Sequence, residues 1–332
     1  MADRTSPPKT HTTPPPPEEA SAGWLEPESS NDADSSYDSS DAASTAYTES
    51  LRSSLLQSVQ ENGRGYHRYR DGHYFIPDDD QEQERLDMQH EMFLITMDRR
   101  LYYAPLTTVT NALDIGTGTG IWAIHFADDH PESNIIGTDL SAIQPSFVPP
   151  NCKFEIDDFE AEWTFPQKFD FIHGRMLAGS IAKPARLFEQ VYAALEPGGW
   201  FELQDFAFPV RSDDGTMVGT PFEHYNQLLV DGLKALGRDG GWASEYDKFM
   251  ADAGFTNIVR VDSKWPQNPW PKDPHYKRLG QWNMVNTLEG LHGFGARLCI
   301  QVLGMGNDEF EVLLAKCRKD IRNTKIHAYW PM

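Results

Sequence analysis

A short apolar strand that runs directly into three alternating glycines constrains the fold of this chain more than any other feature. Residues 111–116 (NALDIG) are predicted as a strand, and Gly118 and Gly120 follow Gly116 before a helix predicted over 119–129. Glycine permits the tight turn where the strand ends, and it lets a ligand approach backbone amides that a Cβ would block. This arrangement predicts an α/β fold with a ligand site at the carboxyl end of the strand.

The spacing of the loop and a neighbouring acid indicate what kind of ligand it holds. A dinucleotide site spaces its glycines G-x-G-x-x-G and keeps acids away, because it holds phosphate at a helix N-terminus. This chain instead has G-x-G-x-G, with Asp114 two residues before the loop. Both features favour a nucleoside without phosphate, such as S-adenosylmethionine with its cationic sulfonium. They argue against the rival interpretation, a nicotinamide-dependent oxidoreductase.

Two later strand ends carry acids that suit such a nucleoside. The predicted strand 135–139 ends in Asp139, which can accept hydrogen bonds from both ribose hydroxyls. The predicted strand 152–156 is followed by Asp158, which can accept from the adenine amino group, and by Phe159, which can pack on the adenine ring. The predicted cofactor-binding residues are Asp114, Gly116, Thr117, Gly118, Gly120, Asp139, Leu140, Asp158 and Phe159.

With these motifs in place, the chain resembles a known family. The run from Leu113 to Ile124, with Asp139, Asp158 and the LEPGGW turn at 195–200, is similar to class I S-adenosylmethionine-dependent methyltransferases. More narrowly, residues 62–87, 136–163 and 169–181 resemble the fungal LaeA-like methyltransferases, which are enzymes or regulators associated with secondary metabolism. The similarity covers residues 60–290. His125 departs from the pattern, since many relatives are expected to carry an acid on this helix.

The resemblance implies a Rossmann-like three-layer α/β sandwich around a mostly parallel, seven-stranded sheet with an antiparallel last strand. It also implies S-adenosylmethionine as the cofactor, and a small molecule or a protein as the methyl acceptor. An amphipathic helix within 82–99 is expected to cover the ligand site as a lid. The predicted strands are 111–116, 135–139, 152–156, 169–173, 200–206 and 255–261, and the resemblance adds 325–330 as the antiparallel seventh strand.

Three regions are predicted along the 332 residues. Residues 1–60 are expected to be a disordered, acidic tail rich in serine and proline, because its composition offers little apolar surface to bury. The alternatives for this tail are a docking or phosphorylation segment and a solubilising one. Residues 61–110 form an N-terminal arm with the lid helix, and 111–332 form the methyltransferase domain, with a helical insertion near 266–306.

Charge and cysteine content limit the partners and the compartment. The formal net charge is −21, which repels nucleic-acid phosphates and anionic membranes, so neither partner is expected. The three cysteines are far apart and show no metal-binding spacing, so no metal site is predicted. With no signal peptide or apolar span recognised, a soluble protein of the cytosol or nucleus is expected.

Methyl transfer is a displacement at carbon, so the enzyme contributes mainly alignment and exclusion of water. An acceptor that carries a proton also needs a base near the reacting atom. His173, at the end of the predicted fourth strand, is the candidate catalytic residue, and a structural histidine is its alternative. Arg175 could pair with the cofactor carboxylate or brace the acidic loops, and Asp205 is a second candidate base. Trp122 is expected to form a wall of the cofactor site.

The sequence supports two hypotheses about function. The first is a methyltransferase that acts on a small molecule or a protein in fungal secondary metabolism. The second is a regulatory scaffold that binds the cofactor and a protein partner but turns over slowly. The intact set of glycines and acids favours the first, and the lack of an unambiguous base in the sequence favours the second.

Overall fold

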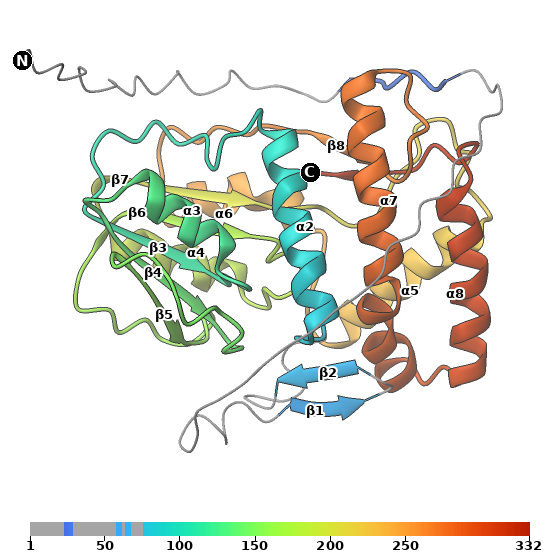
Figure 1. Ribbon diagram of the computed structural model, residues 1–332, viewed down its shortest axis with the longest axis horizontal. Coiled ribbons are helices and arrows are strands. Elements are labelled where there is room, and N and C mark those ends of the chain that lie inside the picture. Colours follow the sequence, from blue (N-terminus) through green and yellow to red (C-terminus); the bar gives the residue numbers. More distant parts are fainter. Residues whose placement is uncertain (1–22, 29–57, 62–63, 68–75) are drawn as a thin grey trace, which may run out of the picture.

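A five-stranded parallel sheet is the main sheet of the computed structural model, which describes residues 23–28, 58–61, 64–67 and 76–332, and it lies at the left in Figure 1. Along the sheet the order is β5-β4-β3-β6-β7. The bounds are β3 Asn111–Ile115, β4 Asn134–Asp139, β5 Cys152–Ile156, β6 Phe169–Arg175 and β7 Leu195–Gln204. From β3 the chain first extends the sheet on one side with β4 and β5, and it then adds β6 and β7 on the other side of β3. In doubly wound sheets, ligands bind where the strand order reverses in this way.

Helices cover both faces of the sheet, as the pleat requires. Helix α3 (Ile121–Asp129) packs Trp122 and Phe126 onto one face, against Phe171 of β6. Helices α4 (Pro184–Ala194) and α6 (Tyr246–Ala253) cover the other face, where Phe188 packs among residues of β3, β6 and β7. Because both faces are covered, the three inner strands β3, β4 and β6 are buried over most of their length, as expected of a parallel sheet, whereas β5 and β7 at its edges are partly exposed. The α/β sandwich predicted from the sequence is confirmed.

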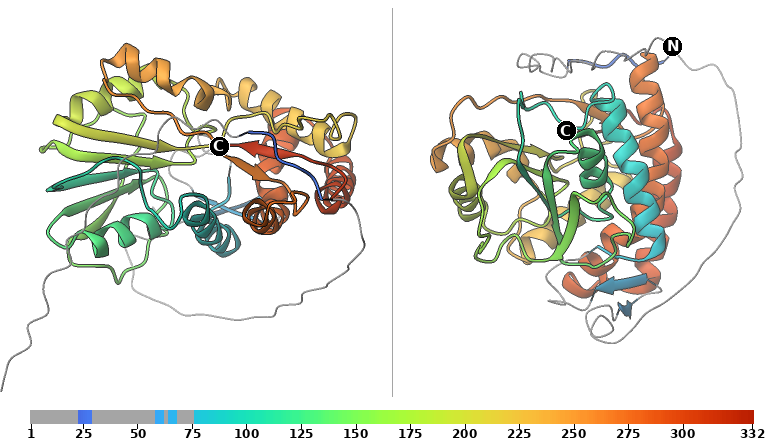
Figure 2. Two further views of the ribbon diagram at one scale, coloured as in Figure 1. Left: turned by 90° about the horizontal axis from the view of Figure 1, so that it is seen from above. Right: turned by 60° about the vertical axis from the view of Figure 1, so that its left-hand side comes forward.

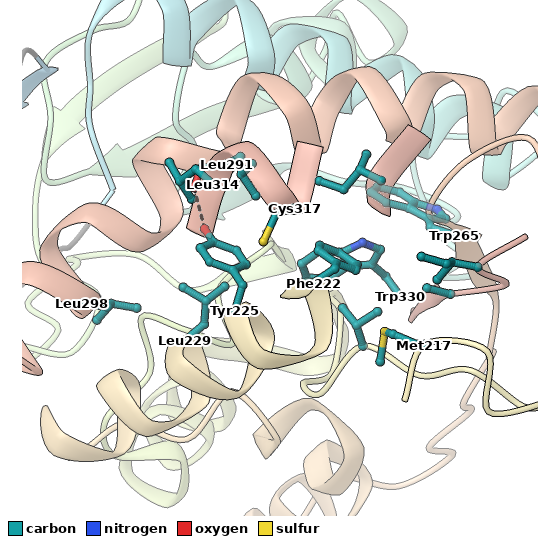
Figure 3. Packing of buried hydrophobic residues seen from close by; sticks show 14 of the residues in the cluster. Met217, Phe222, Tyr225, Leu229, Trp265, Leu291, Leu298, Leu314, Cys317 and Trp330 are labelled. Atoms are coloured by element: carbon teal, nitrogen blue, oxygen red, sulfur yellow. Dashed lines mark hydrogen bonds between the residues drawn. The ribbon is translucent and has the colours of Figure 1, made fainter. Parts of the chain in front are cut away.

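A separate group of helices, which covers neither face of the sheet, lies beside the carboxyl ends of the strands (Figures 1 and 2). It consists of α2 (Asp80–Thr96), α5 (Pro221–Ala235), α7 (Pro274–Gly295), the π-helical turn η2 (Ala296–Val302) and α8 (Asn307–Arg322). These helices enclose the largest apolar core of the described chain, in which Tyr225 and Phe222 are fully buried (Figure 3). The Tyr225 hydroxyl donates to the carbonyl oxygen of Leu291 at 2.5 Å, so its polar atom is satisfied inside the core.

Short elements complete the described chain. Strands β1 (Ser58–Glu61) and β2 (Arg64–His67) form an antiparallel hairpin, and η1 (Trp242–Glu245) is a turn of 3-10 helix before α6. Strands β8 (Lys264–Pro266) and β9 (Tyr329–Pro331) pair antiparallel in a small sheet of their own. Among the described residues, no helix combines the length and the apolar character needed to cross a bilayer.

The predicted sixth and seventh strands require correction. Residues 255–261 form no strand of the main sheet, and the left-handed backbone of Asn257 (φ 56°) interrupts an extended run there. The chain at 329–331 is antiparallel, as expected, but it pairs with β8 and not with two strands of the main sheet. The described sheet therefore has five strands where seven were predicted.

Parts of the segment expected to be disordered are also ordered. Residues 23–28 lie against the body, where Leu25 is buried, the Glu28 amide donates to Trp270 O at 2.8 Å and the Lys272 amide donates to Glu26 O at 2.7 Å. Backbone pairing and the burial of one leucine explain why the composition of the whole segment is misleading here. The rest of the predicted tail, apart from residues 58–60 of β1, lies outside the described residues.

Candidate functional site

The glycine loop joins β3 to α3 with its backbone in the left-handed region at all three glycines. The φ angles are 63° at Gly116, 57° at Gly118 and 80° at Gly120, which side chains rarely adopt. Gly120 also lies under the ring of Phe154 from β5, and a Cβ there would come within 2.7 Å of the ring atom Cε1. The glycines are therefore required by backbone conformation and, at Gly120, by close packing.

Asp114 holds this loop from beneath. Its side chain is buried, and it accepts a hydrogen bond from the Thr117 hydroxyl at 2.6 Å and one from His173 Nδ1 at 2.7 Å. His173 faces it because β3 and β6 are adjacent parallel strands that pair these two residues in register. Both carboxylate oxygens thus contact neighbours within the protein, and Asp114 fixes the conformation of the loop.

Asp139 reaches the same loop from the end of β4. One carboxylate oxygen accepts from the Gly118 amide at 2.8 Å, and the other accepts from the Ser141 amide at 2.9 Å. Gln144 also contacts the loop, because its side-chain amide donates to the Gly118 carbonyl oxygen at 2.7 Å. Leu140 follows Asp139 and is partly exposed. The predicted ribose acid and the glycine loop therefore meet at one edge of the sheet.

The third predicted strand end lies at this edge as well. Asp158 is buried and accepts from the amide of Glu160 at 2.9 Å, within the turn after β5. Phe159 is partly buried, and its Cε1 lies 3.9 Å from where a Cβ on Gly116 would be. The structure thus brings the predicted adenine-binding pair next to the glycine loop.

Helix α2 covers the loop from the opposite side. Leu86 Cδ1 lies 3.5 Å from the position of a Cβ on Gly118, and Asp87 accepts from the Thr119 hydroxyl at 2.7 Å. His90 Nε2 lies 2.9 Å from Nδ1 of His125, the residue that departs from the family pattern. The sequence indicated a covering helix here, but none of these contacts could be identified from it, because each joins residues that are distant along the chain.

The position of this site agrees with comparisons to known proteins. A family model described as a methyltransferase domain matches residues 88–275, which is more than half of the chain. Methyltransferase pytC of Aspergillus terreus is 42% identical over 85% of this chain and 89% of its own length. The chain belongs to the class I S-adenosylmethionine-dependent methyltransferases, in the LaeA-like family.

Two further relatives of this methyltransferase are named laeA, and both are similar to it in sequence over most of its length. The secondary metabolism regulator laeA of Aspergillus fumigatus is 36% identical over 81% of this chain and 74% of its own length. The protein-methionine methyltransferase laeA of Emericella nidulans is also 36% identical, over 81% of this chain and 73% of its own length. The cofactor of this methyltransferase is therefore S-adenosylmethionine.

Arg175, at the end of β6, is a buried cation beside the glycine loop and α2. Its Nη1 lies 3.0 Å from His90 Nδ1, its Nε donates to Gln204 at 2.9 Å and its guanidinium stacks on Phe93. Burial lowers the pKa of Arg175 to about 9, so it stays charged at neutral pH. Its Nη2 is buried without a hydrogen-bond partner among the described residues, which leaves a donor for an anionic ligand group.

His173 does not have the surroundings of a general base. Its side chain is 0% exposed, and its ring stacks on Trp122 with centroids 3.6 Å apart and planes 5° apart. Burial lowers the pKa of His173 although Asp114 opposes this, so the ring is neutral and its Nδ1–H donates to Asp114. A base must reach the proton of the acceptor, so this placement argues against the expected catalytic role and favours the structural alternative.

Trp122 likewise differs from its expected role. Its indole is buried between the His173 and Phe126 rings, and its Nε1–H donates to Leu101 O at 2.9 Å. It therefore belongs to the core beneath α3 and forms no wall of the cofactor site. Its position just after the glycines suggested otherwise, because sequence spacing does not reveal which face of a helix turns toward the sheet.

Asp205, the other candidate base, is buried at the end of β7. Its carboxylate accepts from the Leu177 amide, the Phe206 amide and the Tyr246 hydroxyl, each at 2.9 Å. Burial raises the pKa of Asp205 to about 7 even though these hydrogen bonds favour the charged form. The Asp205 carboxyl group therefore holds the chain around β7 through these hydrogen bonds, and its ionisation is costly to the folded state.

The stability of the protein should depend on pH through Asp205. Below about pH 4 both states hold the proton, but as pH rises toward 7 only the unfolded chain, with an ordinary pKa near 3.9, releases it. The contribution of Asp205 to the free energy of unfolding is therefore lost as the pH rises from about 4 to 7. The destabilising effect of Asp205→Asn should shrink by on the order of 2 kcal/mol between about pH 5 and 7.5, measured by urea unfolding. An effect that stays constant with pH would contradict this.

Proposed function

We propose that this protein transfers the methyl group of S-adenosylmethionine to a small-molecule or protein acceptor in fungal secondary metabolism. The observation that carries the proposal is the meeting of the glycine loop and Asp139 at the edge of the sheet, where the Gly118 amide donates to Asp139. The similarity to a methyltransferase and to a regulator of secondary metabolism supports the biological setting. The three cysteines are unpaired, which suits the reducing environment of cytosol or nucleus.

In this proposal every predicted residue except Asp114 holds one part of the cofactor. The loop Gly116, Thr117, Gly118 and Gly120 lies against the nucleoside and the methionine chain, and Asp114 keeps the loop in shape. Asp139 and Leu140 hold the ribose, and Asp158 and Phe159 hold the adenine. When bound, S-adenosylmethionine supplies an electrophilic methyl group. The protein contributes alignment, and α2 excludes water by covering the loop.

We further propose that the unsatisfied Nη2 of Arg175 donates to the carboxylate of the cofactor. Arg175→Met keeps an apolar chain on Phe93 but removes the charge, so affinity for S-adenosylhomocysteine should fall at least about tenfold. Affinity for 5′-methylthioadenosine should not change, because that nucleoside lacks the amino acid portion. Calorimetry with both ligands measures the two effects. Equal losses for both would show that Arg175 only supports the fold of the site.

The acceptor decides whether the protein must remove a proton. A hydroxyl or amine acceptor loses one, whereas the thioether sulfur of methionine carries none and needs no base. The relative named as a protein-methionine methyltransferase supports a protein acceptor, and the relative pytC is named simply as a methyltransferase. Asp205 and His173 both make hydrogen bonds within the protein, so we propose neither as the base.

The test of the proposed function is transfer of a labelled methyl group. Purified protein is incubated with S-adenosylmethionine that carries a labelled methyl group and with a fungal extract, and label is followed in metabolites and in polypeptides. We expect label in one of the two fractions, and far less with Asp139→Ala at a cofactor concentration near the wild-type Kd. Label that appears equally with the Asp139 variant would contradict the proposal.

The regulatory scaffold remains the second candidate, because a relative 36% identical to this chain is named as a regulator. A scaffold binds S-adenosylhomocysteine as tightly as an enzyme does but transfers no label. It would instead be retained by a protein partner in a cofactor-dependent way. Tight binding without incorporation into either fraction would therefore favour the scaffold over the enzyme.

A further inference from the structure

A chain of hydrogen bonds leads from Arg175 at the end of β6, through helix α2, to the surface of α3. His90 of α2 stands in the middle, with Nδ1 3.0 Å from Nη1 of Arg175 and Nε2 2.9 Å from Nδ1 of His125 on α3. His90 is buried, whereas His125 is exposed. Three elements that are distant along the chain therefore contribute one residue each to a continuous polar path, called the Arg175 network here.

The chemistry of the three groups fixes the direction of both hydrogen bonds. A guanidinium has only donors, so His90 Nδ1 is the acceptor of the bond from Arg175. Burial lowers the pKa of His90 to about 2, and the charge of Arg175 acts in the same direction. The His90 ring is therefore neutral and carries its one proton on Nε2. It donates this proton to His125 Nδ1, which is consequently an acceptor without a proton of its own.

Arg175 is held from two sides. On the side of the sheet its Nε donates to Gln204 of β7 at 2.9 Å. On the other side α2 supplies two contacts, because His90 and Phe93 lie three residues apart and so share a helix face. His90 accepts from Nη1, and the Phe93 ring centroid lies 4.2 Å from the guanidinium carbon. Three contacts determine the orientation of a planar group, so they also determine where the remaining nitrogen, Nη2, points.

We propose that His90 and His125 are positioning residues for Arg175, which hold its Nη2 toward the amino acid portion of the cofactor. The inference rests on the proposed contact between Arg175 and the cofactor carboxylate. His125 acts through His90, and His90 acts through Arg175, so neither histidine is a catalytic residue. Because His90 belongs to α2, the Arg175 network is complete only while α2 lies over the glycine loop. Recognition of the amino acid portion thus depends on the covered form of the site.

The first test compares two ligands by calorimetry on full-length protein. His90→Phe keeps a ring of similar size but removes the acceptor, so affinity for S-adenosylhomocysteine should fall at least about tenfold. Affinity for 5′-methylthioadenosine, which lacks the amino acid portion, should not change. Both affinities are measured on the same preparation, so any loss of folded protein cancels in their ratio. An unchanged ratio would overturn the proposal.

His125 allows a milder test, because it is exposed and its replacement does not disturb the core. His125→Leu leaves the buried Nε2–H of His90 without its acceptor, and it should lower S-adenosylhomocysteine affinity about threefold without affecting 5′-methylthioadenosine. His125→Asn places an oxygen where Nδ1 was, so it should keep most of the affinity. Equal affinities of the leucine and asparagine variants for S-adenosylhomocysteine would contradict a role for the acceptor.

A double-mutant cycle separates this inference from the contact on which it rests. In the Arg175→Met background, His90→Phe should cause no further loss of S-adenosylhomocysteine affinity, because no guanidinium remains to be held. If Arg175→Met alone weakens both ligands equally, the contact with the carboxylate and the positioning role are both wrong. If Arg175→Met weakens only S-adenosylhomocysteine and His90→Phe adds an independent loss, Arg175 binds the carboxylate and the positioning role alone is overturned.

Thr119→Val is the control for loosening of α2. It removes another hydrogen bond between α2 and the glycine loop, the one that Thr119 donates to Asp87, and it leaves the Arg175 network intact. Any loss of affinity should therefore be equal for the two ligands. A loss confined to S-adenosylhomocysteine would show that the histidines act by keeping α2 closed and not by orienting Arg175, which would overturn the proposal.

The protonation of His90 provides a test that needs no ligand. Long-range proton–nitrogen NMR spectra of protein with labelled histidine distinguish the two neutral tautomers from the imidazolium. The His90 signal is assigned by its absence in His90→Phe. At neutral pH we expect the Nε2–H tautomer at His90. An Nδ1–H tautomer or an imidazolium there could not accept from Arg175 and would overturn the proposal.

Discussion

Replacing Asp139 with alanine is expected to lower the affinity for S-adenosylhomocysteine by about 100-fold. The variant lacks the carboxylate that would accept from both ribose hydroxyls, and two such bonds at about 1.5 kcal/mol each, the lower end of the range for bonds to a charged group, account for a factor of this order. Affinity for 5′-methylthioadenosine should fall by the same factor, because it has the same ribose, and this separates Asp139 from Arg175. Calorimetry with both ligands gives the two ratios.

Asp170→Ala is the matched control for this prediction. Asp170 also accepts hydrogen bonds from two backbone amides, those of Thr110 at 2.7 Å and Asn111 at 3.0 Å. It lies at the beginning of β6, however, and therefore at the opposite end of the strands from Asp139. Both variants should therefore lose similar stability, and only Asp139→Ala should lose affinity. Comparable affinities in the two variants would show that the nucleoside is bound elsewhere.

Gly120→Ala should destabilise the fold by about 3 kcal/mol. A non-glycine residue at φ 80° costs about 1–2 kcal/mol, and overlap of its Cβ with the Phe154 ring adds a packing penalty of similar size. Gly118→Ala has the same kind of backbone strain, but its nearest neighbour, Leu86, is at an ordinary 3.5 Å, so it should cost only about 1 kcal/mol. Denaturant unfolding of the two variants gives the difference.

A double-mutant cycle identifies the source of the penalty. Phe154→Leu replaces the ring with a smaller side chain that can move aside, so it should recover part of the stability that Gly120→Ala loses. The same change should not recover any stability in Gly118→Ala, since Phe154 is not among the nearest atoms to a Cβ on Gly118. Additive effects in the Gly120 cycle would show that the strain lies in the backbone alone.

That the glycine loop, Asp139 and Asp158 meet at one end of the sheet could be predicted from the sequence, because the signals are local. Gly118, Asp139 and Asp158 each stand next to a recognisable strand, and the carboxyl ends of parallel strands meet at one edge. The environment of His173 could not be predicted in this way. Its stacking on Trp122 depends on which face of α3 turns inward and on which strand lies beside β3.

The outer strands show the same limit. Residues 255–261 have the composition of a strand, but a strand also needs a partner at the right distance, and composition does not specify one. In the structure Asn257 adopts a left-handed conformation, and residues of this segment and of β7 line a common cavity. The contacts of α2 with Thr119 and His125 could not be predicted from the sequence either, because they depend on how two segments that are distant along the chain pack together.

The way α2 is anchored affects how the nucleoside can enter and leave. Arg85 forms a buried ion pair with Glu82 on α2 itself, and it donates to Asn286 of α7 at 2.6 Å, so the two helices are joined behind the glycine loop. Uncovering the loop therefore requires either breaking this polar contact or moving α2 and α7 together. Product release is accordingly expected to depend on residues of α7 such as Asn286 as well as on those that line the glycine loop.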